Sequence, residues 1–126
     1  MTRTCTASSV APAETLWALV ARPDRWSTWA PHVRGAWGLG SPEVEAGRRG
    51  AVRLLGVLPV PARIDAVEPG RSWAWIVGPV HLVHAVEPAP GGCVVSMTLD
   101  APAPVEAAYG PVVALFTRRL AEVAAR

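Results

Sequence analysis

Glycine and proline divide the middle of the chain into short segments that favour extended backbone. Each segment is rich in valine or other residues of high β-propensity, and turn residues such as Pro69 and Gly70 separate one from the next. The segments are Val33–Leu39, Arg49–Gly56, Val60–Glu68, Arg71–Val77, Val80–Glu87 and Cys93–Ala101. Strands joined by tight turns pair antiparallel, because a parallel connection needs a long crossover. The pattern therefore predicts an antiparallel meander of six strands.

The residues before this meander predict one more strand and two short helices. Thr2–Val10 is dominated by threonine and serine and has no strong helix former, which is typical of a strand. Pro12 and Glu14 both fall in the first turn of a predicted helix, where proline and acidic residues are favoured. Apolar residues then recur at helical spacing to about Ala21. Asp24 begins a second short helix or turn over Arg25–Trp29.

The last segment, about Pro104–Ala125, predicts a long amphipathic helix. Its apolar side chains recur at steps of three and four residues, at Tyr109, Val112, Val113, Phe116, Leu120 and Val123. Pro111 predicts a kink, because proline has no N–H to donate to the preceding turn. A chain of 126 residues has the length of one domain. We therefore expect residues 1–126 to form a single α+β domain in which seven antiparallel strands pack against this helix.

Composition excludes several kinds of chemistry. The chain has no lysine, no asparagine and no glutamine. Without lysine there is no Schiff base and no phosphate-binding loop of the GxxxxGK type. Without the two amides the usual reader of adenine is missing, and a net charge of +2 is too small to favour nucleic acid or an anionic membrane as a partner.

The N-terminus and the cysteines bear on location. Met1–Ser9 is polar, so the sequence predicts neither a secretory signal nor a membrane span. The default expectation is a cytoplasmic protein in which Cys5 and Cys93 are reduced. A disulfide between them needs the first and last strands to pair, and a reducing compartment disfavours it.

Three stretches resemble one known superfamily. APAETLWALVARPDRWSTWAPHV (Ala11–Val33) is similar to the opening of the START/Bet v 1-like (SRPBCC) superfamily, particularly its polyketide cyclase/dehydrase and lipid-transport branch. IDAVEPGRSWAW (Ile64–Trp75) resembles the strand–turn–strand that follows there, and HAVEPAPGGCVVSMTLD (His84–Asp100) resembles the last hairpin. Their order and spacing extend the resemblance over almost the whole chain. The resemblance implies a helix-grip fold, in which a curved seven-stranded sheet wraps the long C-terminal helix around an apolar cavity.

His84 is a candidate polar group of that cavity. It has the same strand parity as Leu82 and Val86, and the resemblance implies that this face lines the cavity. A single imidazole among apolar neighbours is a candidate general base near neutral pH, with a hydrogen-bonded core histidine as the alternative. His81 points to the opposite face of the strand, so the two histidines cannot bind one metal ion and no metal site is expected.

Six tryptophans supply most of the aromatic surface. Trp73 and Trp75 alternate along one strand, so both indoles lie on the same face, either as core or as a wall for a planar ligand. The resemblance implies that Trp26 and Trp29 close one end of the cavity, with Trp29 as a ligand contact and Trp26 as core. His32 lies either at the cavity mouth or in an exposed loop.

Tyr109, the only tyrosine, lies on the apolar face of the last helix. Its phenol would donate a hydrogen bond to a ligand carbonyl, or it is a core residue with its hydroxyl at the surface. Arg63 and Asp65 share one strand face, and we interpret them as a solvated outer pair in preference to a buried anchor. The predicted catalytic residues are His84 and Tyr109, and the predicted ligand contacts are Trp29, Trp73, Trp75, Leu82, Met97, Val113 and Phe116.

The sequence favours two hypotheses about function. The first is a polyketide cyclase-like enzyme of natural-product biosynthesis, which promotes cyclisation and dehydration of a hydrophobic substrate in a dry pocket and needs no cofactor. The second is a non-catalytic carrier of a small lipophilic ligand, which needs the same cavity but no base. A chaperone-activator protein ranks third. Fold alone does not choose among them, and the chain is expected to be a monomer or a homodimer.

Overall fold

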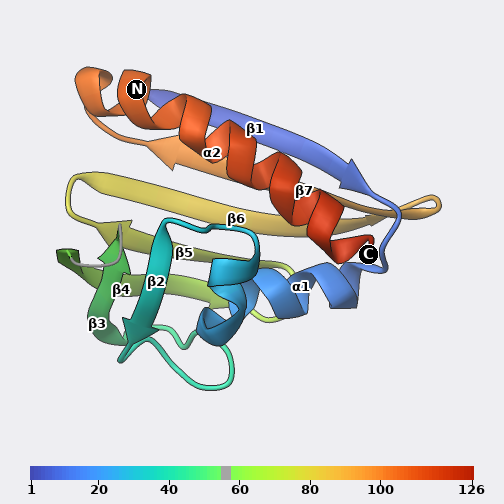
Figure 1. Ribbon diagram of the computed structural model, residues 1–126, viewed down its shortest axis with the longest axis horizontal. Helices are drawn as coiled ribbons and strands as arrows, with labels where there is room; N and C mark the ends of the chain where they lie inside the picture. Colours follow the sequence, from blue (N-terminus) through green and yellow to red (C-terminus); the bar gives the residue numbers. More distant parts are fainter. Residues whose placement is uncertain (55–57) are drawn as a thin grey trace.

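Seven antiparallel strands form one sheet in which the first strand lies beside the last (Figure 1). The structure, a computed structural model, describes residues 1–54 and 58–126. The strands are β1 (Thr2–Ser9), β2 (Val33–Trp37), β3 (Arg49–Leu54), β4 (Leu58–Glu68), β5 (Ser72–Val77), β6 (Val80–Ala89) and β7 (Gly92–Asp100). Their order across the sheet is β1-β7-β6-β5-β4-β3-β2. The predicted meander is confirmed.

Most strand boundaries lie within two residues of the predicted ones. Gly38 has a φ of +80°, which lies outside the extended region and explains why β2 ends at Trp37 instead of Leu39. The end of the predicted strand Arg49–Gly56 lies outside the described residues.

Two irregularities in strand register accompany the curvature of the sheet. The pairing of β2 with β3 shifts between Val33 and Gly35, and that of β4 with β5 shifts between Ile64 and Ala66. Such bulges bend a strand and increase its local twist. The half of the sheet containing β2, β3 and β4 therefore turns toward the helices instead of continuing flat.

Three helices lie on the concave side of the sheet (Figure 1). They are α1 (Ala13–Ala21), the 3₁₀ helix η1 (Pro23–Thr28) and α2 (Ala103–Ala124). The second helix begins two residues before the predicted Arg25, because the fixed φ of Pro23 suits a first helical turn. The long helix α2 continues through Pro111 without interruption.

The long helix packs over β1 and β7, and its C-terminal end lies beside α1 (Figure 1). Its N-terminal half is held by Arg3, whose Nε donates to Glu106 Oε1 over 2.6 Å. Near its other end, Ser9 Oγ donates to the carbonyl of Ala121 over 2.8 Å. Both contacts join α2 to the edge strand β1. The helix therefore lies over one side of the concave face and does not cover its middle.

The outer face of the sheet carries the expected charged pair. Arg63 and Asp65 are both exposed, and Asp65 Oδ2 lies 3.3 Å from Nε2 of His81 on the neighbouring part of the same face. His84 is 2% exposed on the inner face, so the two histidines do point apart. Among the described residues no group of three potential metal ligands occurs.

Candidate functional site

A cavity of about 550 Å³ lies between the sheet, the η1 turn and the N-terminal half of α2. Valine, leucine, methionine and aromatic side chains make up most of its wall. Within the described part of the chain, no aspartate, glutamate or arginine lines it. Its size and apolar character match sites that bury a drug-sized molecule.

All nine predicted site residues lie on the wall of this cavity. The sheet contributes the predicted residues of β5, β6 and β7, and η1 with its following residue contributes Trp29. The helix α2 contributes the remainder. The nine are Trp29, Trp73, Trp75, Leu82, His84, Met97, Tyr109, Val113 and Phe116. Their location supports the prediction, whereas their roles remain predictions.

His84 and Trp73 are cross-strand neighbours whose rings stack. The ring centroids are 3.9 Å apart and the planes differ by 13°. Nδ1 of His84 lies 3.2 Å from the carbonyl oxygen of Trp73. Because a carbonyl only accepts hydrogen bonds, Nδ1 carries the proton and Nε2 carries the lone pair.

Burial lowers the pKa of His84 from 6.5 to about 3, and the hydrogen bond to Trp73 opposes this only in part. The imidazole is therefore neutral across the physiological pH range. A base whose conjugate acid has so low a pKa removes protons poorly. His84 is consequently better suited to accept a hydrogen bond than to act as the general base near neutral pH that the sequence suggested.

A second polar pair lies where the loop after η1 meets α2. The hydroxyl of Tyr109 is 3.5 Å from Nε2 of His32, and the His32 ring stacks on Phe116 at a centroid distance of 4.5 Å. Burial lowers the pKa of His32 and raises that of Tyr109, so both side chains are neutral at pH 7. The stack and the hydroxyl contact join the loop to α2 over the cavity.

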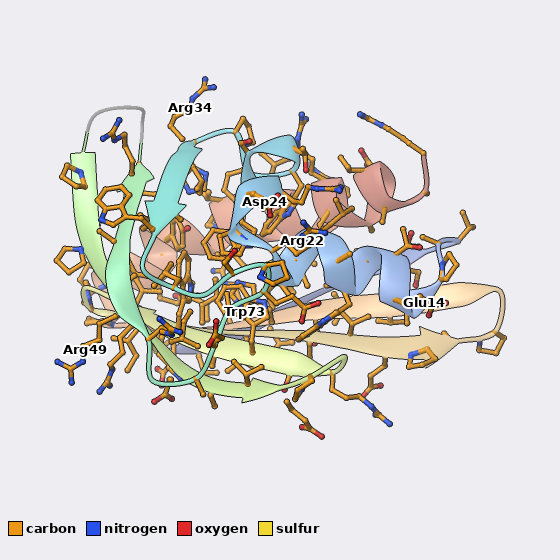
Figure 2. The ribbon with its side chains drawn as sticks, turned by 90° about the horizontal axis from the view of Figure 1, so that it is seen from below. Glu14, Arg22, Asp24, Arg34, Arg49 and Trp73 are labelled. Atoms are coloured by element: carbon orange, nitrogen blue, oxygen red, sulfur yellow. The ribbon has the colours of Figure 1, made fainter. Side chains whose placement is uncertain are left out.

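Three of the six tryptophans, Trp26, Trp73 and Trp75, form one connected cluster on the wall of the cavity. Trp26 stacks on Trp73 with centroids 5.3 Å apart, and Trp75 meets both rings edge to face. The indole nitrogens of Trp26 and Trp73 both donate to the carbonyl of Val20, over 2.8 and 3.0 Å. Trp73 is 1% exposed and lies in the interior, whereas Arg34 and Arg49 point outward (Figure 2). Trp73 thus serves mainly the core, and Trp75 offers more surface to a ligand.

The predicted ligand contacts omit several residues that line the cavity, among them Val52, Val60, Val77 and Val80. Trp26, which is predicted as a core residue, and His32, for which a place at the mouth is one alternative, also line it. Strand parity alone would have found Val77 and Val80, which alternate in step with Trp75 and Leu82. No periodic signal could have placed His32, because it belongs to a loop.

Comparison with known proteins identifies the family. The sequence matches the family described as "Polyketide cyclase / dehydrase and lipid transport" over residues 2–126. The chain belongs to this family. No curated protein matches it in sequence. Membership supports the binding of a hydrophobic ligand.

Several solved structures have the same fold as this protein, although their sequences are only 10–15% identical to it. A START superfamily protein from Mycobacterium smegmatis is 15% identical with a TM-score of 0.75, and the match covers 98% of this chain and 96% of that one. The Aha1 dimer from Colwellia psychrerythraea is 13% identical with a TM-score of 0.80, covering 99% and 96%. A Bacillus halodurans protein is 10% identical with a TM-score of 0.80, covering 100% and 97%. The helix-grip fold is confirmed. None of the described helices is long and apolar enough to span a membrane.

Proposed function

We propose that this protein binds and carries a small, flat, polyketide-like molecule in the cavity beneath α2. The observation that supports this most directly is a cavity of about 550 Å³ whose described wall is mainly apolar and carries only neutral polar groups. A cavity of this character favours a lipophilic guest, because apolar surface leaves water on both partners.

Native mass spectrometry tests this proposal. The purified protein is incubated with a mixed set of flat, uncharged, three- and four-ring molecules. Each complex and its stoichiometry are identified from its mass. A one-to-one complex with an unaltered guest is the expected result. The absence of any complex across the set would contradict the proposal.

Catalysis of a cyclisation is the second candidate, because His84 on β6 and Tyr109 on α2 line the same cavity. In such a reaction Nε2 of His84 would take the α-proton of one carbonyl group, and the resulting enolate carbon would attack a ketone carbon of the same molecule. The new alkoxide would take back that proton, and loss of water would follow. The cavity would contribute mainly by holding the two carbons close together. The Tyr109 hydroxyl would donate to the enolate oxygen.

Turnover distinguishes the two candidates. A flexible polyketone is incubated with the protein, with the Tyr109→Phe variant and with no protein, and ring formation is followed by absorbance. Cyclisation well above the protein-free rate, reduced in the variant, would support an enzyme. Binding without acceleration would support the carrier.

A further inference from the structure

The hydrogen-bonding groups of the cavity lie on opposing elements and differ in character. His84 belongs to β6 in the sheet, whereas Tyr109 belongs to α2 and meets His32 of the loop. Whether each group donates or accepts follows from the contacts it already makes. Together they specify the polar pattern of a matching ligand.

The group at the sheet is an acceptor. The proton on Nδ1 of His84 is committed to the Trp73 carbonyl, which leaves the Nε2 lone pair without a hydrogen-bond partner among the described residues. The stacked indole of Trp73 also restrains the ring from turning. A ligand that forms a hydrogen bond with Nε2 of His84 must have an O–H or N–H group to donate.

The group at the helix is a donor. Nδ1 of His32 is buried and has no hydrogen-bond partner in residues 1–54 and 58–126. If the Tyr109 phenol donated to Nε2 of His32, then Nδ1 would carry a buried proton with no acceptor, and orphaned N–H groups are rarer than orphaned lone pairs. The tautomer that avoids this has Nε2–H donating to the phenol oxygen. It leaves the O–H of Tyr109 free to donate to a ligand.

The charge of the cavity sets the third condition. Within the described chain, no arginine lines it and no lysine exists in the sequence, so a carboxylate or phosphate would lose its water without gaining a counter-ion. His84 does not become a cation near neutral pH, since burial lowers its pKa to about 3.

From these contacts we infer that the ligand is an uncharged, flat hydroxy ketone or a close analogue, whose hydroxyl donates to His84 Nε2 and whose carbonyl accepts from the Tyr109 hydroxyl. This inference rests on the proposed binding function and adds a ligand class to it. It gives His84 the role of a specificity residue that touches the ligand as an acceptor.

Five tricyclic probes of nearly equal shape test the inference at pH 7. They are fluorene, 2-hydroxyfluorene, 2-methoxyfluorenone, 2-hydroxyfluorenone and fluorenone-2-carboxylate. Dissociation constants are measured by quenching of tryptophan fluorescence. Each lost hydrogen bond is expected to weaken binding about tenfold. The order expected is 2-hydroxyfluorenone tightest, then the two probes that keep one group, then fluorene, with the carboxylate at least about a hundredfold weaker than the best.

Two variants assign each group to its residue. His84→Phe keeps a ring against Trp73 but removes the acceptor, so 2-hydroxyfluorenone should fall to the affinity of 2-methoxyfluorenone, whose own affinity should hold. Tyr109→Phe removes the donor, so 2-hydroxyfluorenone should fall to the affinity of 2-hydroxyfluorene. An unchanged melting temperature and unchanged fluorene binding show that each variant is folded.

The outcomes separate this inference from the proposed function. Equal binding of all five probes, or equally tight binding of the carboxylate, would overturn the hydroxy ketone assignment while leaving the cavity as a binding site. Failure of every probe, fluorene included, would overturn both. Loss of selectivity in only one variant would overturn the half of the assignment that concerns the other residue.

Discussion

The imidazole of His84 stacks on the indole of Trp73 at 3.9 Å and donates to the carbonyl of that same residue. One neighbour thus fixes both the orientation and the tautomer of the ring. The contact places the free Nε2 lone pair in an apolar wall, where it is an acceptor and stays neutral. Trp73, which is a predicted ligand contact, therefore also orients the neighbouring histidine.

Burial of His84 makes the stability of the protein depend on pH. The pKa is 6.5 when unfolded and about 3 when folded, so between these values the unfolded chain binds a proton that the folded chain does not. Stability contributed by the neutral ring is fully present above pH 6.5 and is lost as pH falls. Between pH 6.5 and 5 this amounts to about 2 kcal/mol. Urea unfolding should show that loss in the native protein and less of it in His84→Phe; parallel pH profiles would contradict this.

Gly110 in α2 makes room for the ion pair that anchors the helix. A Cβ at this position would overlap the guanidinium of Arg3, whose Nε donates to the buried Glu106. Glycine to alanine within a helix normally stabilises by about 1 kcal/mol. Here Gly110→Ala should instead lower the free energy of unfolding by about 1 kcal/mol, because it leaves Glu106 without its partner.

The Arg3→Ala background provides the control for this prediction. Without the guanidinium there is nothing for the new methyl group to displace, so Gly110→Ala should stabilise the Arg3→Ala protein by up to about 1 kcal/mol. The same change in urea midpoint in both backgrounds would show that the overlap is unimportant.

Ala108 offers a way to close the cavity from the helix. It lines the cavity but is exposed at its outer side, whereas the adjacent Ala107 is exposed and does not line it. Ala108→Trp should place an indole over the opening and weaken fluorene binding more than about tenfold without unfolding the protein. Ala107→Trp is the matched control and should bind as the native protein does. Equal effects of the two changes would place the opening elsewhere.

The two cysteines should behave as unequal free thiols. In the register of β1 with β7, Cys5 lies opposite Met97 and Cys93 lies opposite Ser9, so no disulfide forms between them. Cys93 is 1% exposed, and burial raises the pKa of its thiol, while Cys5 is half-buried. A thiol reagent should label Cys5 within minutes in the native protein and Cys93 only after denaturation. Comparable rates would contradict the described burial.

Strand number, helix positions and the residues that share one face of a strand could be predicted from the sequence. Alternation placed Trp73 and Trp75 on one face of their strand, and glycine and proline marked the turns between strands. These features are local: they depend on backbone preference and on a period of two or 3.6 residues. The sequence could not decide whether Cys5 and Cys93 lie opposite each other. That depends on the register of β1 with β7, which the adjacency of the two strands does not fix.

The chemistry of the site depended on contacts that no sequence spacing contains. His84 could be assigned to the cavity wall from strand parity together with the family resemblance, but its neutral state comes from burial in the folded chain. The pairing of His32 with Tyr109 joins residues 77 positions apart. Sequence alone thus determined which side chains share a face, because that is a property of each strand and helix. Only the tertiary structure decided which of them donate, accept or carry charge, because protonation depends on the water and the partners that the folded chain leaves around each group.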